Sequence, residues 1–192
     1  MESLFALGIG IGIASVAGVR AFAPLALAAL ILGVLVSPPE ALRPLSVGMS
    51  AIGALFALAV LESVLDKFSA LERPLNWAMV PVRAAVGAVL FAATMALESP
   101  GTLAPWLIAG ALVAGAVAIS KVYLRPSVRR QSAGVSPTFL SVCEDLVGVA
   151  GGALAFFVPY LPALLVAFLL LFYYRVRKRR GRKFGGLRIL GD

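Results

Sequence analysis

Long apolar stretches make up most of the chain, and short polar segments separate them. The apolar stretches cover about residues 4–36, 45–68, 80–97, 103–124, 137–158 and 161–174. A helix needs about 20 apolar residues to cross the hydrocarbon core of a bilayer. The pattern therefore predicts an all-α fold, a polytopic membrane bundle of about six transmembrane segments. The proline-containing segments 37–39 and 99–101 are predicted turns.

The first apolar stretch is too long for one straight span. As a helix its 33 residues would reach roughly 50 Å, against a hydrocarbon core of about 30 Å. Pro24 lacks a helical N–H and its ring clashes with the preceding turn, while Gly18 loosens the backbone. We therefore expect this segment to be broken or re-entrant near Gly18–Pro24. It could cross once, cross twice to give seven segments, or fold back.

Two further boundaries carry specific expectations. Segment 72–74 is expected to be a polar loop, with Pro81 in the first turn of the helix that follows, where proline is well tolerated. Tyr173 and Tyr174, followed by Arg and Lys, are typical of an interfacial anchor at the end of the last span. The domain organisation is thus one transmembrane helical domain, 1–174, and a basic cytoplasmic tail, 175–192.

The distribution of Lys and Arg predicts the orientation, because cytoplasmic loops carry the excess of these residues. With six crossings, the side that holds both termini carries 13 Lys and Arg, among them Arg125, Arg129 and Arg130 in one loop. Arg43 alone lies opposite. The C-terminus is therefore expected in the cytoplasm, with the protein in a bacterial inner membrane. With seven segments the N-terminus would lie outside, and Arg20 would face inward.

Composition excludes several classes of protein. Only 14% of the residues are charged, against about a quarter in soluble domains. The chain has no histidine and one cysteine, which excludes Cys/His zinc sites and triads that contain histidine. We expect no cofactor and no metal site. Eight of the 17 Lys and Arg lie in the last 18 residues, so the basicity favours anionic lipid headgroups as partners of the tail and not nucleic acid. A homo-oligomer remains open.

Charged residues inside the predicted spans are the candidate functional residues. A charge deep in a bilayer is costly, so such residues usually pair or face a cavity that serves as a pathway or ligand site. Given the predicted orientation, these residues converge on the cytoplasmic half of the membrane. Those expected to bind a substrate or ion are Arg20, Glu62, Asp66, Arg83, Lys121, Glu144 and Asp145.

The spacing of two of these acids calls for a counter-ion. Glu62 and Asp66 are four residues apart and share a helix face, where like charges repel unless a cation, proton or base lies between them. Arg83 or Lys121 is the expected counter-ion. The alternative is that the basic residues, Lys67 above all, extend along apolar surface to reach the headgroups.

Three functions fit this pattern, and the first is preferred. The first is a small transporter or lipid translocase with a cytoplasm-facing polar cavity. Its bases would receive an anionic substrate and its acids would carry coupling protons or cations. The second is a non-transporting assembly or accessory protein whose charges lock helix packing. The third, a lipid enzyme using Glu144 and Ser141, is least favoured, and no enzyme activity is expected.

Four short motifs resemble a known family. They are Ala17 to Pro24 (AGVRAFAP), Leu61-Glu62 with Asp66-Lys67, Pro81-Val82-Arg83 with Gly87-Ala88, and Glu144-Asp145. Over about residues 5–165 the chain is similar to a small bacterial membrane family, domain of unknown function 4126. The resemblance implies a multi-pass bacterial membrane protein, and it supplies no activity.

Overall fold

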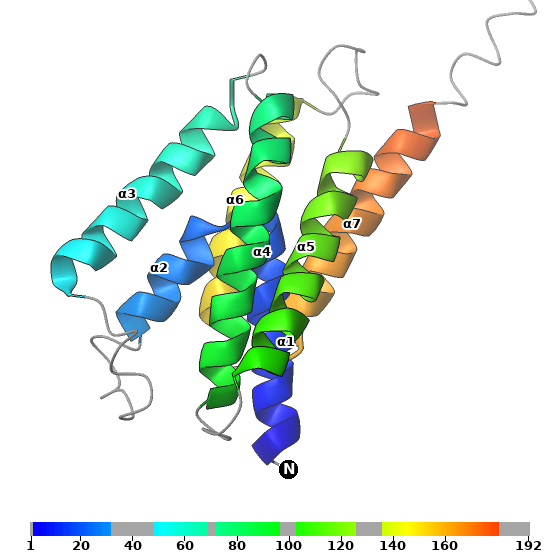
Figure 1. Ribbon diagram of the computed structural model, residues 1–192. Coiled ribbons are helices and arrows are strands. Elements are labelled where there is room, and N and C mark those ends of the chain that lie inside the picture. The colour runs from blue at the N-terminus through cyan, green and yellow to red at the C-terminus, as the bar shows by residue number, and fades with distance from the viewer. Residues whose placement is uncertain (1, 32–47, 69–71, 97–102, 126–135, 181–192) are drawn as a thin grey trace, which may run out of the picture.

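All elements in the described part of the chain are helices (Figure 1). The computed structural model describes residues 2–31, 48–68, 72–96, 103–125 and 136–180. The predicted turns at 37–39 and 99–101, and the tail beyond Arg180, lie outside these residues. The helices are α1 (Glu2–Val19), α2 (Phe22–Leu30), α3 (Met49–Leu65), α4 (Glu72–Ala96), α5 (Ala104–Leu124), α6 (Pro137–Leu154) and α7 (Leu161–Arg180). The predicted all-α fold is confirmed.

The first apolar stretch folds back on itself. α1 ends at Val19, α2 begins at Phe22, and the chain reverses its direction between them (Figure 1). Pro24 explains the position of the break, because it has no N–H for the Arg20 carbonyl and its ring clashes with that carbonyl in a continuous helix. The predicted break is confirmed.

This fold-back changes the expected arrangement of the termini. The start of α1 and the end of α7 lie at opposite ends of the bundle (Figure 1). An arrangement with both termini on one side, which is expected from six crossings, does not match these positions. The described part of the first stretch forms two helices, α1 and α2, that turn back on each other, as in the alternatives of a fold-back or of seven segments.

α4 starts earlier than the hydropathy pattern predicts. It begins at Glu72, so the residues expected to form a polar loop form its first turn, and Pro81 lies inside the helix. Pro74 takes the first-turn position that tolerates proline. An interior proline removes one hydrogen bond, which neighbouring groups can compensate in a membrane helix. The hydropathy rise at Val80 marks the start of the apolar part and not the start of the helix.

α7 continues past the predicted end of the last span. It runs to Arg180, so the first residues of the predicted tail are helical. Arg177 donates a hydrogen bond to the Tyr123 carbonyl in the last turn of α5. A basic side chain is favourable there, because the carbonyls at a helix C-terminus carry partial negative charge. α7 is thereby attached to α5 beyond the apolar segment.

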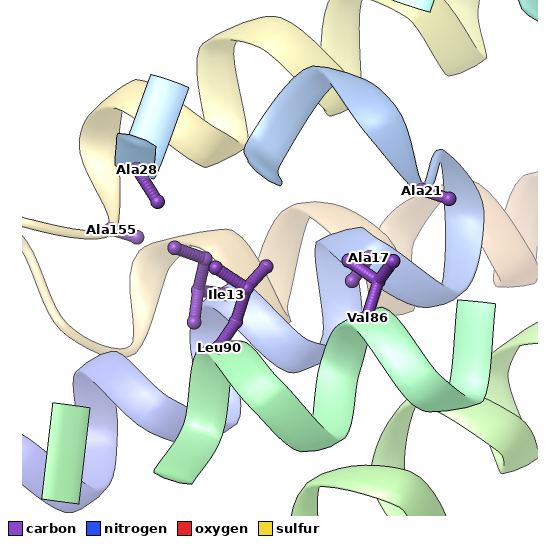
Figure 2. Packing of buried hydrophobic residues seen from close by; sticks show 7 residues of the cluster. All are labelled: Ile13, Ala17, Ala21, Ala28, Val86, Leu90 and Ala155. Carbon is purple, nitrogen blue, oxygen red and sulfur yellow. The ribbon is translucent and has the colours of Figure 1, made fainter. Parts of the chain in front are cut away.

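α1 is the central helix of the bundle. It packs against α4, α5, α6 and α7, and the side chains from Ile13 to Val19 are buried. Figure 2 shows one core cluster in which small side chains from α1 and α2 meet α4 and the end of α6. Its members are Ile13, Ala17, Ala21, Ala28, Val86, Leu90 and Ala155. The small residues let the helix axes approach closely.

α3 lies at the edge of the bundle and packs chiefly against α2 (Figure 1). Within α3 itself the buried residues are Ile52 and Glu62. Large apolar side chains such as Met49 and Val60 are exposed, with 68% and 62% of their surface accessible. α3 thus buries little apolar surface against the protein.

Two of the described helices are long and apolar enough to cross a membrane. They are Pro74–Ala96, which is most of α4, and Ala104–Leu124, which is α5. Leu4–Val19 and Met49–Leu65 are shorter apolar helices. Only 22% of the apolar window of α5 is buried, whereas the core helix of a soluble protein would be mostly enclosed. These helices are compatible with a helical membrane bundle and suggest membrane association.

Glycines allow the closest approach between α4 and α5. A Cβ on Gly87 would overlap the Cβ of Ala114, and one on Gly110 would lie 2.5 Å from the Gly87 carbonyl oxygen. By contrast, a Cβ on Gly115, also between these helices, would lie 3.7 Å from the Cβ of Ala84. The two helices therefore depend on glycine at the first two positions and not at the third.

We predict that Gly87→Ala destabilises the protein by about 1–3 kcal/mol, because overpacking forces α4 and α5 apart. Gly115→Ala, the same change in the same helix pair, should leave stability unchanged or raise it by up to about 1 kcal/mol, the helix propensity of alanine. Thermal unfolding of both variants in detergent measures this difference. Equal melting temperatures would show that the close α4–α5 contact is not formed.

Candidate functional site

Charged side chains from five parts of the chain meet where the first apolar stretch is broken. We call them the charge cluster. All seven residues expected from the sequence belong to it, and Arg125 joins them. Asp145 is partly exposed, with 24% of its side chain accessible, and the others are buried. The cluster comprises Arg20 between α1 and α2, Glu62 of α3 with Asp66 at its C-cap, Arg83 of α4, Lys121 of α5 with Arg125 at its C-cap, and Glu144 and Asp145 of α6.

The two helix ends at the break are satisfied by charges from other helices. The Glu62 carboxylate accepts hydrogen bonds from the Ala21 and Phe22 backbone N–H groups at 3.1 and 3.3 Å. Ala21, the N-cap residue of α2, makes no side-chain capping bond, and the first turn has no acidic residue. The Lys121 ammonium donates to the Val19 carbonyl at 3.0 Å. An anion thus lies at the positive end of α2 and a cation at the negative end of α1.

Arg20 links the acids of α3 and α6. Its Nη2 lies 2.9 Å from Asp66 and 2.8 Å from Asp145. The same nitrogen is 3.6 Å from Glu144 and donates to the Ser141 hydroxyl at 3.1 Å. Its Nε and Nη1 are buried and have no hydrogen-bond partner among the described residues. The guanidinium, whose residue is 1% exposed, therefore has donor capacity that the described chain does not use.

A hydrogen-bonded chain connects the two acids of α3 through α4. The Arg83 Nη2 lies 3.1 Å from Glu62, and its Nη1 donates to the Asn76 side chain at 3.1 Å. Asn76 in turn donates to Asp66 at 3.1 Å. Arg83 and Lys121 are the counter-ions expected for Glu62 and Asp66, and of these two Arg83 forms an ion pair with Glu62. Asp66 pairs with Arg125, whose Nη1 lies 2.8 Å from the carboxylate.

Glu144 is the most enclosed acid. Its carboxylate lies 2.8 Å from the Lys121 ammonium and 3.1 Å from Arg125, and it accepts a hydrogen bond from the Tyr173 hydroxyl at 2.5 Å. Glu144, Lys121 and Tyr173 are each 0% exposed. An unpaired carboxylate would be very costly at such a position, so these partners are what permit the charge to be buried.

Of the three bases Lys67, Arg83 and Lys121, only Lys67 is exposed enough to reach lipid headgroups. Arg83 and Lys121 are 1% and 0% exposed and point into the cluster. The Lys67 side chain is 42% exposed and lies 3.8 Å from Asp145. Near it, Ser63 donates a hydrogen bond to Asp145 at 2.8 Å. Lys67 therefore lies at the rim of the cluster.

Sequence reasoning missed Arg125, Asn76 and Tyr173. The hydropathy pattern predicts a loop at Arg125, although Arg125 follows Lys121 by four residues and so continues the same helix face. Asn76 precedes Arg83 by seven residues, again on one face, but the predicted loop placed it outside the helix. The expectation that Tyr173 anchors at the membrane interface is wrong, because its side chain is buried. Tyr174 is 49% exposed. No local pattern distinguishes the two tyrosines, because the choice depends on Glu144 of another helix.

The cluster can hold opposite charges out of water because it is balanced. Its four bases, on the α1–α2 junction, α4 and α5, face four acids on α3 and α6. In the described part of the chain, no group of three or more Cys, Asp or Glu side chains is arranged to hold a metal ion. The chemistry available is the binding of anions by guanidinium and ammonium groups, and the uptake of protons or cations by carboxylates.

The fold and site define an all-helical bundle with a buried charge cluster at a helix break, an architecture compatible with a membrane protein. Residues 7–179 match the family described as Domain of unknown function (DUF4126), and the chain belongs to this family. The resemblance seen in the sequence motifs is therefore confirmed. No curated protein and no solved structure matches the chain.

We predict that Arg83→Met destabilises the protein by about 3–5 kcal/mol, because it leaves the buried Glu62 carboxylate without its basic partner. The double variant Glu62→Gln/Arg83→Met should recover part of this loss. Lys67→Met, at the exposed rim, should cost less than about 1 kcal/mol. Unfolding free energies in mixed micelles give the comparison. A double variant no more stable than Arg83→Met would contradict a direct pair.

We predict that Tyr173→Phe lowers stability by about 1.5–3 kcal/mol, the range for a hydrogen bond to a charged group. Tyr174→Phe removes the same hydroxyl from the next, exposed position and should change stability by less than about 0.5 kcal/mol. Melting temperatures of the two variants, measured side by side, test the Tyr173–Glu144 contact. Similar melting temperatures for both variants would contradict the buried hydrogen bond from the Tyr173 hydroxyl to Glu144.

Proposed function

We propose that the protein is a small integral membrane transporter or lipid translocase that binds an anionic group at the charge cluster. The observation that carries the proposal is the helix break whose two ends lie against Glu62 and Lys121. Non-helical backbone at membrane depth is tolerated where it is buried in protein or lines a cavity. In many transporters such broken helices form the substrate and ion sites.

The proposed topology is a multi-pass protein in a bacterial inner membrane. The end of α7 lies at the same end of the bundle as the start of α4 and the end of α5 (Figure 1). With the basic end of α7 in the cytoplasm, as the excess of Lys and Arg favours, the N-terminus lies outside. The basic tail then contacts anionic headgroups of the inner leaflet.

The roles follow from the charges. Arg20, Arg83 and Lys121 bind the anion. The carboxylates of Glu62, Asp66 and Glu144 take up coupling protons or cations. The buried arrangement, in which each cluster carboxylate lies near a basic group, corresponds to a closed state without substrate. Its enclosure favours a small anion over a lipid headgroup, since a headgroup would need a lateral opening for its acyl chains. Opening to the cytoplasmic side then exposes the bases.

A second function is favoured by the same balance of charges. Each cluster carboxylate lies near a basic group, as expected if the charges serve only to fix helix packing. In that case the protein is a non-transporting assembly or accessory protein. Neutralising Glu144 would then reduce the amount of folded protein and change no flux.

We expect anion flux into proteoliposomes to fall about tenfold or more in Glu144→Gln and Arg20→Lys, equivalent to about 1.4 kcal/mol of lost binding or transition-state energy. Arg20→Lys keeps the charge but loses the planar fork that reaches several acceptors. Arg175→Ala, an exposed change on α7, is the matched control and should retain wild-type flux.

Melting temperatures of the same preparations separate transport from folding. Reduced flux in variants that melt like the wild type supports the transporter. Wild-type vesicles that move no anion, together with variants that are only less stable, would favour the accessory role.

A further inference from the structure

α3 contributes half of the acidic charge to the cluster. Its carboxylates, Glu62 and Asp66, face bases on the α1–α2 junction, α4 and α5. The remaining acids, Glu144 and Asp145, belong to α6. If α3 moves aside, four bases face only two acids, and the site carries a net charge of +2. Binding of a dianion would return the net charge of the site to zero.

Apolar packing holds α3 only weakly in its place. Ile52 is its one buried apolar side chain, and its exposed side would face lipid in a membrane. Because lipid tails replace apolar contacts between helices at little cost, polar contacts decide whether a membrane helix stays docked. For α3 these are the bonds of Glu62, Ser63 and Asp66. A ligand that competes for the partners of these residues therefore releases the helix.

The two α3 carboxylates occupy separate subsites. Glu62 is held by the α2 N-terminus and by Arg83, and Asp66 is held by Arg20 and Arg125, with Asn76 alongside. Residues four apart on a helix have Cβ atoms about 5–6 Å apart. The oxygens of one phosphate or sulfate lie too close together to fill both subsites, whereas the two ends of a short dicarboxylate span them.

The cluster also has unused donors for an incoming ligand. Arg20 Nε and Nη1 and Arg83 Nε are buried without a hydrogen-bond partner among the described residues. Buried guanidinium N–H groups are costly to leave unpaired, and carboxylate oxygens match them well. These side chains add a second observation to the helix terminus, and both favour an anion.

We infer that the ligand class of the cluster is a small dicarboxylate, which takes the place of the Glu62 and Asp66 carboxylates while α3 moves aside as the gate. This rests on the proposed anion transport, whose substrate it specifies. α3 then carries an internal dianion that keeps the site closed and neutral until the ligand arrives. No covalent step is involved.

Thermal unfolding of the purified full-length protein with succinate tests the inference, with sulfate and acetate as comparison anions at equal ionic strength. Glu62→Gln/Asp66→Asn removes the resident charges and keeps the side-chain volumes. Succinate at saturation should raise the melting temperature of this variant by about 5–10 °C and that of the wild type much less. Glu144→Gln/Asp145→Asn, the matched control, makes the same charge change but leaves the α3 carboxylates in place, and should respond less.

Each other outcome has a definite meaning. Equal shifts for the two double variants, or sulfate or acetate acting as well as succinate, would overturn the dicarboxylate assignment. If Glu62→Gln/Asp66→Asn does not fold, the single variant Glu62→Gln replaces it, and a succinate shift no larger than in the wild type overturns the inference.

Succinate flux in wild-type proteoliposomes separates this inference from the proposed function. Flux of another anion without succinate flux keeps the transporter and removes the dicarboxylate. Succinate binding to Glu62→Gln/Asp66→Asn, with no flux of any anion in the wild type, keeps the ligand class and removes transport.

Discussion

The interruption of the first helix at Arg20 is the constraint on which the rest of the structure depends. It frees backbone carbonyls at the end of α1 and N–H groups at the start of α2, where Val19, Arg20 and Ala21 are buried. Glu62 and Lys121 satisfy these groups with full charges. Each of those charges then needs its own partner, which draws Arg83 and Glu144 into the interior. The charge cluster is thus the consequence of one broken helix.

The packing of the bundle follows from the same place. α1 is surrounded by four helices, and small residues along it and its neighbours bring their axes close. Gly148 shows how this serves the site, because a Cβ there would lie 3.0 Å from the Arg20 side chain. α3 differs from the other helices, because ion pairs and hydrogen bonds hold it in the bundle more than apolar contacts do. An added anion can therefore compete with the carboxylates of α3 for their basic partners.

Much of this arrangement could be predicted from the sequence, and the failures have physical causes. The break near Pro24 is local chemistry, and buried charges in apolar stretches must find each other, so seven of the eight cluster residues were identifiable. Hydropathy does not detect a polar first turn, so the pattern predicts a helix start near Val80, whereas α4 begins at Glu72. The inward position of Tyr173 depends on a distant carboxylate, which a pattern along one helix does not reveal.

The balance of charges also limits how the chain can vary. Eight ionised groups that sum to zero produce little electric field beyond their own neighbourhood, whereas loss of one leaves a monopole in a poorly screening medium. Single replacements in the cluster are therefore disfavoured, and compatible replacements come in pairs of opposite sign. Because Arg20 contacts acids of both α3 and α6, its position is tied to two helices at once. Descendants of this sequence should change the outer face of α3 freely and its inner acids together with their partners.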